Sequence, residues 1–246
     1  MGIGKSRIQS KFNQHIEEFK GDEYKPIVLT DITSEYVDLL FEKFQRKNNE
    51  EKQIVKIMVL GKTGNGKSHI INCILKKVVA QANAGFDAGT IRPTEFKIIK
   101  ENIELSFIDV DGYGEGIEYL NYKEKIKALI YIHRPSIIWY VRESRDIRMS
   151  KNEQKEFLVF KELKVSVIFI ANRIDREESE EIHNQWRANF ERIDGTIQTF
   201  IGFPRLKLNQ LDENADIESL VDVTLRYAID INEMIKNEKS SNKNRM

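Results

Sequence analysis

Residues 54–68 read Ile-Val-Lys-Ile-Met-Val-Leu-Gly-Lys-Thr-Gly-Asn-Gly-Lys-Ser, and this stretch decides the fold. Its apolar first half is rich in β-branched side chains and stops at glycine, which indicates a buried strand. Gly61–Ser68 then matches G-x-x-x-x-G-K-S, the pattern of a phosphate-binding loop. The residues that follow are apolar at helical spacing. A strand, a phosphate-binding loop and a helix are therefore predicted in that order.

The loop has the residues that phosphate binding needs. Glycines let the backbone curl so that its N–H groups converge on a phosphate, and the helix N-terminus adds partial positive charge there. Lys67 is expected to reach the terminal phosphates as a catalytic residue, and the Ser68 hydroxyl to bind Mg²⁺. The nucleotide-binding residues predicted here are Gly61, Thr63, Gly64, Asn65, Gly66, Lys67, Ser68 and His69. The loop alone does not choose between ATP and GTP.

Composition limits the classes of function. The 246 residues are 40% hydrophobic, which suffices for a sizeable core. The 39 basic and 39 acidic residues cancel, so no net charge favours a nucleic acid or a membrane surface as the main partner. Cys73 is the single cysteine, which excludes an internal disulfide and favours the reducing cytoplasm. A buried small hydrophobe is expected there. No apolar run approaches about 18 residues, so no transmembrane segment is predicted.

The chain divides into three predicted parts. Residues 1–53 form an N-terminal extension with two amphipathic helices, at about 8–19 and 35–48, which either pack on the next domain or meet a partner. Residues 54–236 form the main domain, and the polar tail 237–246 is expected to be disordered.

Within 54–236, strands and helices alternate. Strands are expected at 54–60, 94–100, 103–109, 136–141, 165–171, 196–200 and 205–208, and helices at 68–80, to about 133, 149–163, 177–192 and 217–235. Only the pair around residues 101–102 reads as a hairpin. The prediction is an α/β fold of three layers, with a mostly parallel sheet, one antiparallel pair and helices on both faces.

Two further motifs follow predicted strands, where ligands bind in such folds. Asp109-x-x-Gly112 ends the second strand of the hairpin. Asp109 is expected to hold Mg²⁺, and the Gly112 N–H to approach the γ-phosphate as part of the catalytic site. Asp111 would hold a water or cap the turn.

Asn172-Arg173-Ile174-Asp175 follows the apolar strand 165–171. A carboxylate can accept hydrogen bonds from both N1–H and the exocyclic amine of guanine, and adenine presents no such pair. Asp175 would thus select the base. Alternatively, it caps the helix that starts near Glu177, and the two roles can coexist.

Together, these three motifs resemble those of the translation-factor-related class of P-loop GTPases over roughly residues 54–235. Gly61–Ser68 looks most like the immunity-associated, chloroplast-import-receptor and septin branch. Residues 66–72 and Asp109–Gly114 also resemble Era-like and ribosome-assembly GTPases. The resemblance implies a P-loop NTPase G domain that binds GTP and GDP with Mg²⁺.

The resemblance also assigns roles. It implies a switch threonine that is catalytic and binds the metal, with Thr94 favoured over Thr90. It implies that Asn172 contacts guanine N7 and supports the loop. Arg173 stands where the family usually has Lys, and its guanidinium can stack on the base or ribose. A further base contact would fall near Asn209.

Departures from the family pattern bear on hydrolysis. Tyr113 stands where Ras-like enzymes have a water-orienting Gln. Asn65 is at the fifth loop position and Gly64 at the fourth, whereas the potassium-dependent branch has Asn at the fourth. We therefore expect slow hydrolysis by a molecular switch that a homodimer or a protein partner accelerates. Arg142, Arg145 and Arg148 could supply a group in trans or form a solvated loop. The alternative is a GTP-binding scaffold protein with little turnover.

Overall fold

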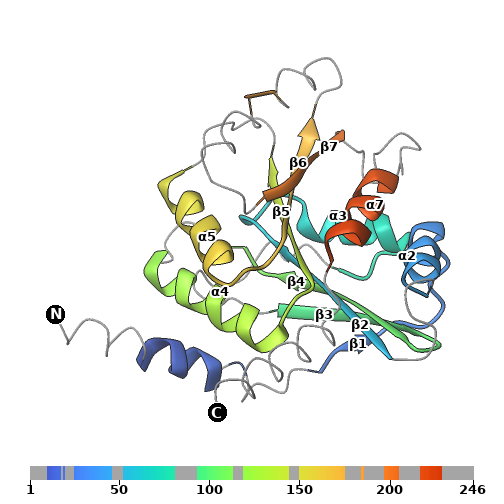
Figure 1. Cartoon of the computed structure of the whole chain (residues 1–246), viewed down its shortest axis with the longest axis horizontal. Coiled ribbons are helices and arrows are strands. Elements are labelled where there is room, and N and C mark those ends of the chain that lie inside the picture. The colour runs from blue at the N-terminus through green and yellow to red at the C-terminus, as the bar shows by residue number, and fades with distance from the viewer. Residues whose placement is uncertain are drawn as a thin grey trace, which may run out of the picture.

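A twisted sheet runs through the protein, and helices cover both of its faces (Figure 1). The computed structural model describes residues 10–17, 19, 25–45, 52–80, 93–112, 119–143, 150–174, 184–185, 197–204 and 217–228. Within them the sheet has seven strands in the order β1-β3-β4-β2-β5-β6-β7. The strands are β1 (Ile27–Val28), β2 (Gln53–Leu60), β3 (Pro93–Lys100), β4 (Ile103–Val110), β5 (Ile137–Glu143), β6 (Val167–Ile174) and β7 (Ile197–Pro204).

All neighbouring strands pair in parallel except β3 and β4, which form the antiparallel hairpin that the sequence predicts. Glu101 takes the left-handed backbone at its turn, with φ of 54°. The helices are α2 (Glu35–Gln45), α3 (Lys67–Leu75), α4 (Tyr119–His133), α5 (Lys151–Glu162) and α7 (Ile217–Tyr227). Figure 1 shows α2, α3 and α7 on one side of the sheet, and α4 and α5 on the other.

The core forms two apolar clusters, one on each face of the sheet. In β2, Ile57 and Val59 belong to the cluster with α2, α3 and α7, whereas Met58 and Leu60 belong to the cluster with α4 and α5. Because side chains alternate along a strand, a strand buried on both faces must be mostly apolar. That explains why β2 and β6 appear in the sequence as nearly continuous apolar runs.

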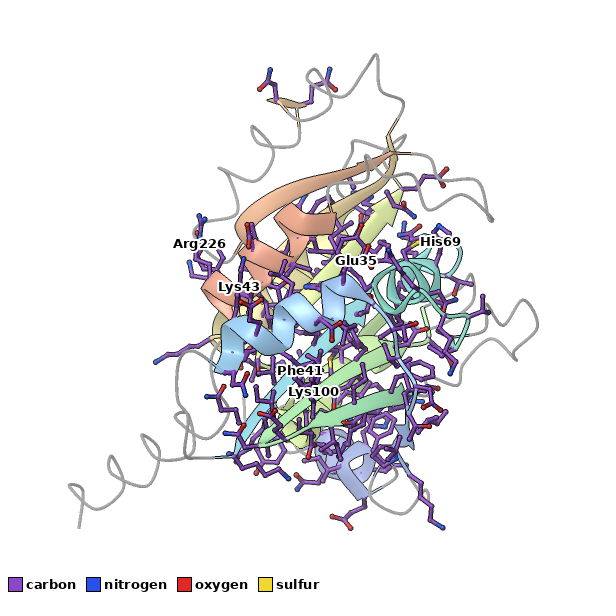
Figure 2. The ribbon with its side chains drawn as sticks, turned by 90° about the vertical axis from the view of Figure 1, so that its right-hand side faces the viewer. Glu35, Phe41, Lys43, His69, Lys100 and Arg226 are labelled. Atoms are coloured by element: carbon purple, nitrogen blue, oxygen red, sulfur yellow. The ribbon has the colours of Figure 1, made fainter. Side chains whose placement is uncertain are left out.

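The described N-terminal residues pack on this domain. β1 pairs with β3 at the sheet edge, and α2 buries Phe41 and Phe44 in the first cluster. Figure 2 shows α2 beside α7, where Lys43 pairs with Asp222. Residues 10–17 are helical, and the Phe12 ring lies 5.9 Å from that of Tyr131 on α4. Of the two alternatives for the predicted helices, packing on the domain is the one that the described residues adopt.

Two predicted elements differ from the structure. α3 ends at Leu75 instead of residue 80, because Lys76 adopts a left-handed backbone (φ 47°) and its N–H bonds back to the helix. β7 covers the strand predicted at 196–200 and continues to Pro204, because a strand paired with only one described neighbour tolerates proline at its end. The strand predicted at 205–208 lies outside the described residues.

Other expectations fall partly or wholly outside the described residues. Of the predicted helix 177–192, only residues 184–185 are described, and both are helical. The tail 237–246 lies outside. The boundary between the N-terminal extension and the main domain, predicted at residue 53, stays a prediction. Among the described residues, no helix is long and apolar enough to cross a membrane.

Candidate functional site

The backbone of the Gly61–Ser68 loop takes conformations that require glycine. Gly61 has φ of 141°, and a Cβ there would lie 2.0 Å from the Val141 carbonyl oxygen of β5. Gly66 has φ of 91°, precedes α3 as its N-cap, and would place a Cβ 2.2 Å from Asn172 Nδ2. The loop therefore lies directly against the ends of β5 and β6, and its following helix begins at Lys67. The first N–H groups of a helix have no partner within the helix, so they can bind an anion.

Two asparagines brace the loop. The Asn172 side chain donates to the Asn65 carbonyl at 2.8 Å, and the Asn65 side chain donates to the Val141 carbonyl at 3.0 Å. Both side chains are buried. The loop is thereby tied to β5 and β6, and the brace fits the loop-supporting role that the family resemblance gives to Asn172.

Lys67, Ser68 and Asp109 meet where α3 begins. Ser68 Oγ donates to Asp109 Oδ2 at 2.6 Å, and Lys67 Nζ donates to the Lys62 carbonyl at 3.2 Å. Burial lowers the pKa of the Lys67 ammonium, while Asp109 and Asp111 raise it. Burial raises the pKa of the Asp109 carboxyl, which the hydrogen bond from Ser68 and the charge of Lys67 lower. An anion beside Lys67 would favour its charged form.

The loop also contacts the end of β4. Thr63 Oγ1 donates to the Gly112 carbonyl at 2.9 Å, and a Cβ on Gly112 would lie 2.2 Å from the Thr63 nitrogen. Gly112 therefore lies against the phosphate-binding loop, and the approach of its N–H to the γ-phosphate stays a prediction.

A cavity of about 160 Å³ opens beside this contact. Its lining consists of Ile27, Val79, Ala80, Thr94, Phe96, Asp109 and Asp111. Thr94 is opposite Asp109 in the β3–β4 register, and directly opposite residues share one face of a sheet. The candidate switch threonine and the candidate metal carboxylate thus border one space.

The second half of the predicted base-binding motif lies outside the described residues. β6 continues to Ile174, so Asn172 and Arg173 lie within the strand instead of after it. The pairing with β7 is irregular between Ala171 and Ile174, which lets the strand continue through these polar residues. Asp175 and Asn209 lie outside, as do Thr90, Tyr113 and the side chain of Arg173.

His69, a predicted nucleotide-binding residue, has a side-chain partner in its own helix. It lies in the first turn of α3, and its Nε2 lies 3.5 Å from Cys73 Sγ. Burial raises the pKa of the Cys73 thiol to about 11, in keeping with the buried, unreactive cysteine that we expect.

Arg142 was a candidate for a group acting in trans, but it is 3% exposed and pairs with Glu153 at 3.3 Å. This expectation is wrong for Arg142, because the side chain lies under α5. Arg145 and Arg148 lie outside the described residues.

Sequence reasoning missed how β5 supports the loop. Tyr140 donates to Glu156 on α5 at 2.7 Å, directly before the Val141 carbonyl that contacts Gly61 and Asn65. The signal available in the sequence is the pair of polar residues among apolar ones in the strand, a pattern that buried strands rarely contain without a partner.

Comparison with known proteins agrees with these motifs. Residues 56–173 match the sequence model of a family described as 50S ribosome-binding GTPase. GTPase Der from Nautilia profundicola is 27% identical over 144 residues, which make up 57% of this chain and 30% of that protein. The tRNA modification GTPase MnmE from Mesoplasma florum is 26% identical over 204 residues, or 76% of this chain and 42% of that protein. The chain spans less than half the length of these curated relatives.

Solved structures share the fold. A dimerisation-deficient mutant of Toc33 from Arabidopsis thaliana has a TM-score of 0.55 at 16% identity, covering 80% of this chain and 93% of that chain. Era from Aquifex aeolicus, bound to GDP and aluminium fluoride, has a TM-score of 0.53 at 17% identity, covering 72% of this chain and 58% of that chain. The predicted α/β fold is thereby confirmed.

Proposed function

We propose that this chain, which carries a P-loop GTPase domain of the translation-factor-related class at residues 56–173, binds GTP and GDP and hydrolyses GTP as a molecular switch. The observation that carries the proposal is the meeting of Lys67, Ser68 and Asp109 at the N-terminus of α3, beside a loop whose backbone requires glycine at positions 61 and 66. Donor groups and a helix N-terminus that converge in this way suit the phosphates of a nucleotide.

The donor set also fits Mg²⁺. Asp109 Oδ1 is buried and has no hydrogen-bond partner among the described residues, while Oδ2 already accepts from Ser68. A hard cation, which prefers oxygen ligands, would give Oδ1 a partner. Ser68, Asp109 and Thr94 are the residues that would hold it. When bound, Mg²⁺ would neutralise charge on the β- and γ-phosphates.

For the protein's own part in hydrolysis, Lys67 would bind the phosphate oxygens, and the Gly112 N–H would orient the γ-phosphate. The contact between Thr63 and Gly112 supports this arrangement, because it fixes the end of β4 against the loop. Asn172, Arg173, Asp175 and Asn209 are proposed to bind guanine, with Asp175 selecting it over adenine.

Slow hydrolysis and activation by a second molecule are also part of the proposal. Tyr113 in place of Gln supports slow turnover, since a phenol cannot orient water as an amide does. Dimerisation is described as important for the GTPase activity of the chloroplast translocon components Toc33 and Toc159, which share the fold at a TM-score of 0.52. We propose a homodimer through the nucleotide face, or a protein activator, for this chain.

The second candidate is a GTP-binding scaffold protein that turns over little, which the same Tyr113 favours. For either function we propose a cytoplasmic location, supported by the single free cysteine. The balanced charge of the chain gives no reason to add a nucleic-acid partner, although Era has been solved with nucleotides of 16S ribosomal RNA.

Single-turnover hydrolysis of GTP, measured over a range of protein concentrations, tests the proposal. A rate constant that rises with protein concentration supports an enzyme activated by dimerisation. A slow rate that is independent of concentration points to an activator of another kind. Bound GTP that stays intact at every concentration supports the scaffold function instead.

A further inference from the structure

Residues 140–142 of β5 lie between the phosphate-binding loop and helix α5. The carbonyl oxygen of the middle residue, Val141, accepts the Asn65 side chain at 3.0 Å and lies so close to Gly61 that a Cβ there would approach it to 2.0 Å. Its backbone thus contacts the loop at two points. This carbonyl is therefore one of the contacts that hold the loop, together with those of Asn172 and Gly112.

The neighbours of Val141 hold α5. Their side chains, at positions i and i+2 of the strand, point to the same face of the sheet. Tyr140 donates its hydroxyl to Glu156 Oε2 at 2.7 Å, and Arg142 Nε lies 3.3 Å from Glu153 Oε1. We call these four side chains the β5–α5 cluster. Each of them is 3% exposed or less.

Helix capping fixes the α5 side of the cluster. Ser150 and Glu153 form a capping box, in which Glu153 Oε2 accepts the Ser150 N–H at 2.8 Å and Ser150 Oγ accepts the Glu153 N–H at 3.2 Å. Glu156 lies three residues further, on the same side of the helix. The capped first turn therefore holds both carboxyl groups against β5.

The charges in the cluster do not balance if both acids are ionised. Arg142 pairs with Glu153, whereas Glu156 accepts from the neutral Tyr140 hydroxyl, and a second buried carboxylate charge beside Glu153 is costly. Of the groups around Glu156, Tyr140 and Arg142 come from β5, Glu153 from α5, and Lys62 from the loop. Burial, with the charge of Glu153 in addition, raises the pKa of Glu156 to about 8, although Tyr140 and Lys62 lower it. Glu156 is therefore protonated at neutral pH, while Glu153 pairs with Arg142.

We propose that Glu156 is a positioning residue whose protonated carboxyl holds the end of β5, and through Val141 the phosphate-binding loop, in the arrangement that binds nucleotide. When the proton leaves to solvent, Glu156 and Glu153 repel each other inside the protein. The first turns of α5 then move from β5, and the loop loses its fixed support. Nucleotide affinity falls as pH rises. This inference rests on the proposed function, because it concerns how that same site is controlled.

The test is the dissociation constant of a fluorescent GDP analogue at pH 7 and pH 9, measured with the full chain. The first variant is Glu156→Gln, which keeps an acceptor for Tyr140 but cannot ionise. The matched control on α5 is Glu162→Gln, since Glu162 lies at the surface and pairs with Lys127. In wild type and in Glu162→Gln, the dissociation constant should rise between pH 7 and pH 9. That rise should be roughly three- to tenfold larger than the rise in Glu156→Gln, which is about the effect of one hydrogen bond.

If the dissociation constant rises equally with pH in all three proteins, the inference is overturned. In that case the proton on Glu156 has no effect on nucleotide affinity, and the residue has a structural role alone. If Glu156→Gln does not fold, Tyr140→Phe decides the matter at pH 7. Weaker binding by about threefold or more supports the inference, and wild-type affinity refutes it. If wild type binds no GDP at either pH, the proposed function itself is wrong, so the two failures can be told apart.

Discussion

Gly61→Ala is the substitution whose effect the structure defines best. The new Cβ would lie 2.0 Å from the Val141 oxygen and 3.1 Å from the Val141 carbonyl carbon. Since real Cβ atoms stay about 3.0 Å or more from such atoms, the backbones must separate by about 1 Å. Neither can move easily, because Leu60 pairs with Tyr140 and Val141 pairs with Ile170 inside the sheet.

The cost has two parts. Overpacking in a rigid core costs about 1–3 kcal/mol, and an alanine at φ of 141° costs roughly 1–3 kcal/mol more. A total of about 4 kcal/mol would lower the melting temperature of a chain of this size by about 10 °C. Thermal unfolding followed by circular dichroism measures it.

Gly64→Ala is the matched control. Its φ is 85°, but nothing lies within 4 Å of the added Cβ, so only the conformational cost of about 1–2 kcal/mol remains. The control should melt about 4 °C below wild type. Equal shifts for the two variants would refute the argument that the loop is pressed against β5.

Three other changes test separate contacts. Asn172→Ala leaves the buried Asn65 carbonyl without its donor. The free energy of unfolding in urea should therefore fall by about 1–3 kcal/mol. A loss below about 0.5 kcal/mol would show that the contact between Asn172 and Asn65 does not stabilise the protein. Ser68→Ala removes the hydroxyl that bonds to Asp109, and should raise the Mg²⁺ concentration for half-maximal turnover roughly tenfold or more; an unchanged magnesium titration would contradict the metal assignment. Because the pKa of Glu156 is raised to about 8, the folded state keeps a proton that the unfolded state releases near pH 4.5, so stability should fall as pH rises through this interval. The decrease in the free energy of unfolding that Glu156 causes over this interval is at most roughly 5 kcal/mol. Urea unfolding at pH 6 and pH 8 measures part of that decrease, and Glu156→Gln should abolish it.

Hydrophobic pattern predicted most of the sheet, for a physical reason. β2 and β6 are buried on both faces, so their sequences had to be apolar, and the β3–β4 hairpin was evident from its alternation. The strand predicted to end at residue 200 continues in β7 to Pro204, because proline is tolerated at the end of a strand with a single described neighbour.

The site was predictable only where chemistry dictates the local sequence. The glycines of the loop, Ser68 and Asp109 have fixed spacing because a phosphate and a cation impose it. The contact of Asn65 with Val141 depends on the register of β2 against β5, which no local pattern encodes. The burial of Arg142 depends on the placement of α5, and a sequence window around the arginine resembles an exposed loop.

Competition between nucleotides shows whether the site selects guanine. Wild-type protein is loaded with a fluorescent GDP analogue in Mg²⁺ buffer and titrated with GTP, GDP and ATP. GTP and GDP should displace the probe, whereas ATP should not at about a hundredfold higher concentration, a difference of roughly 3 kcal/mol or more in binding free energy. Displacement by ATP at the same concentrations as GTP would contradict the assignment of this protein as a guanine-nucleotide switch.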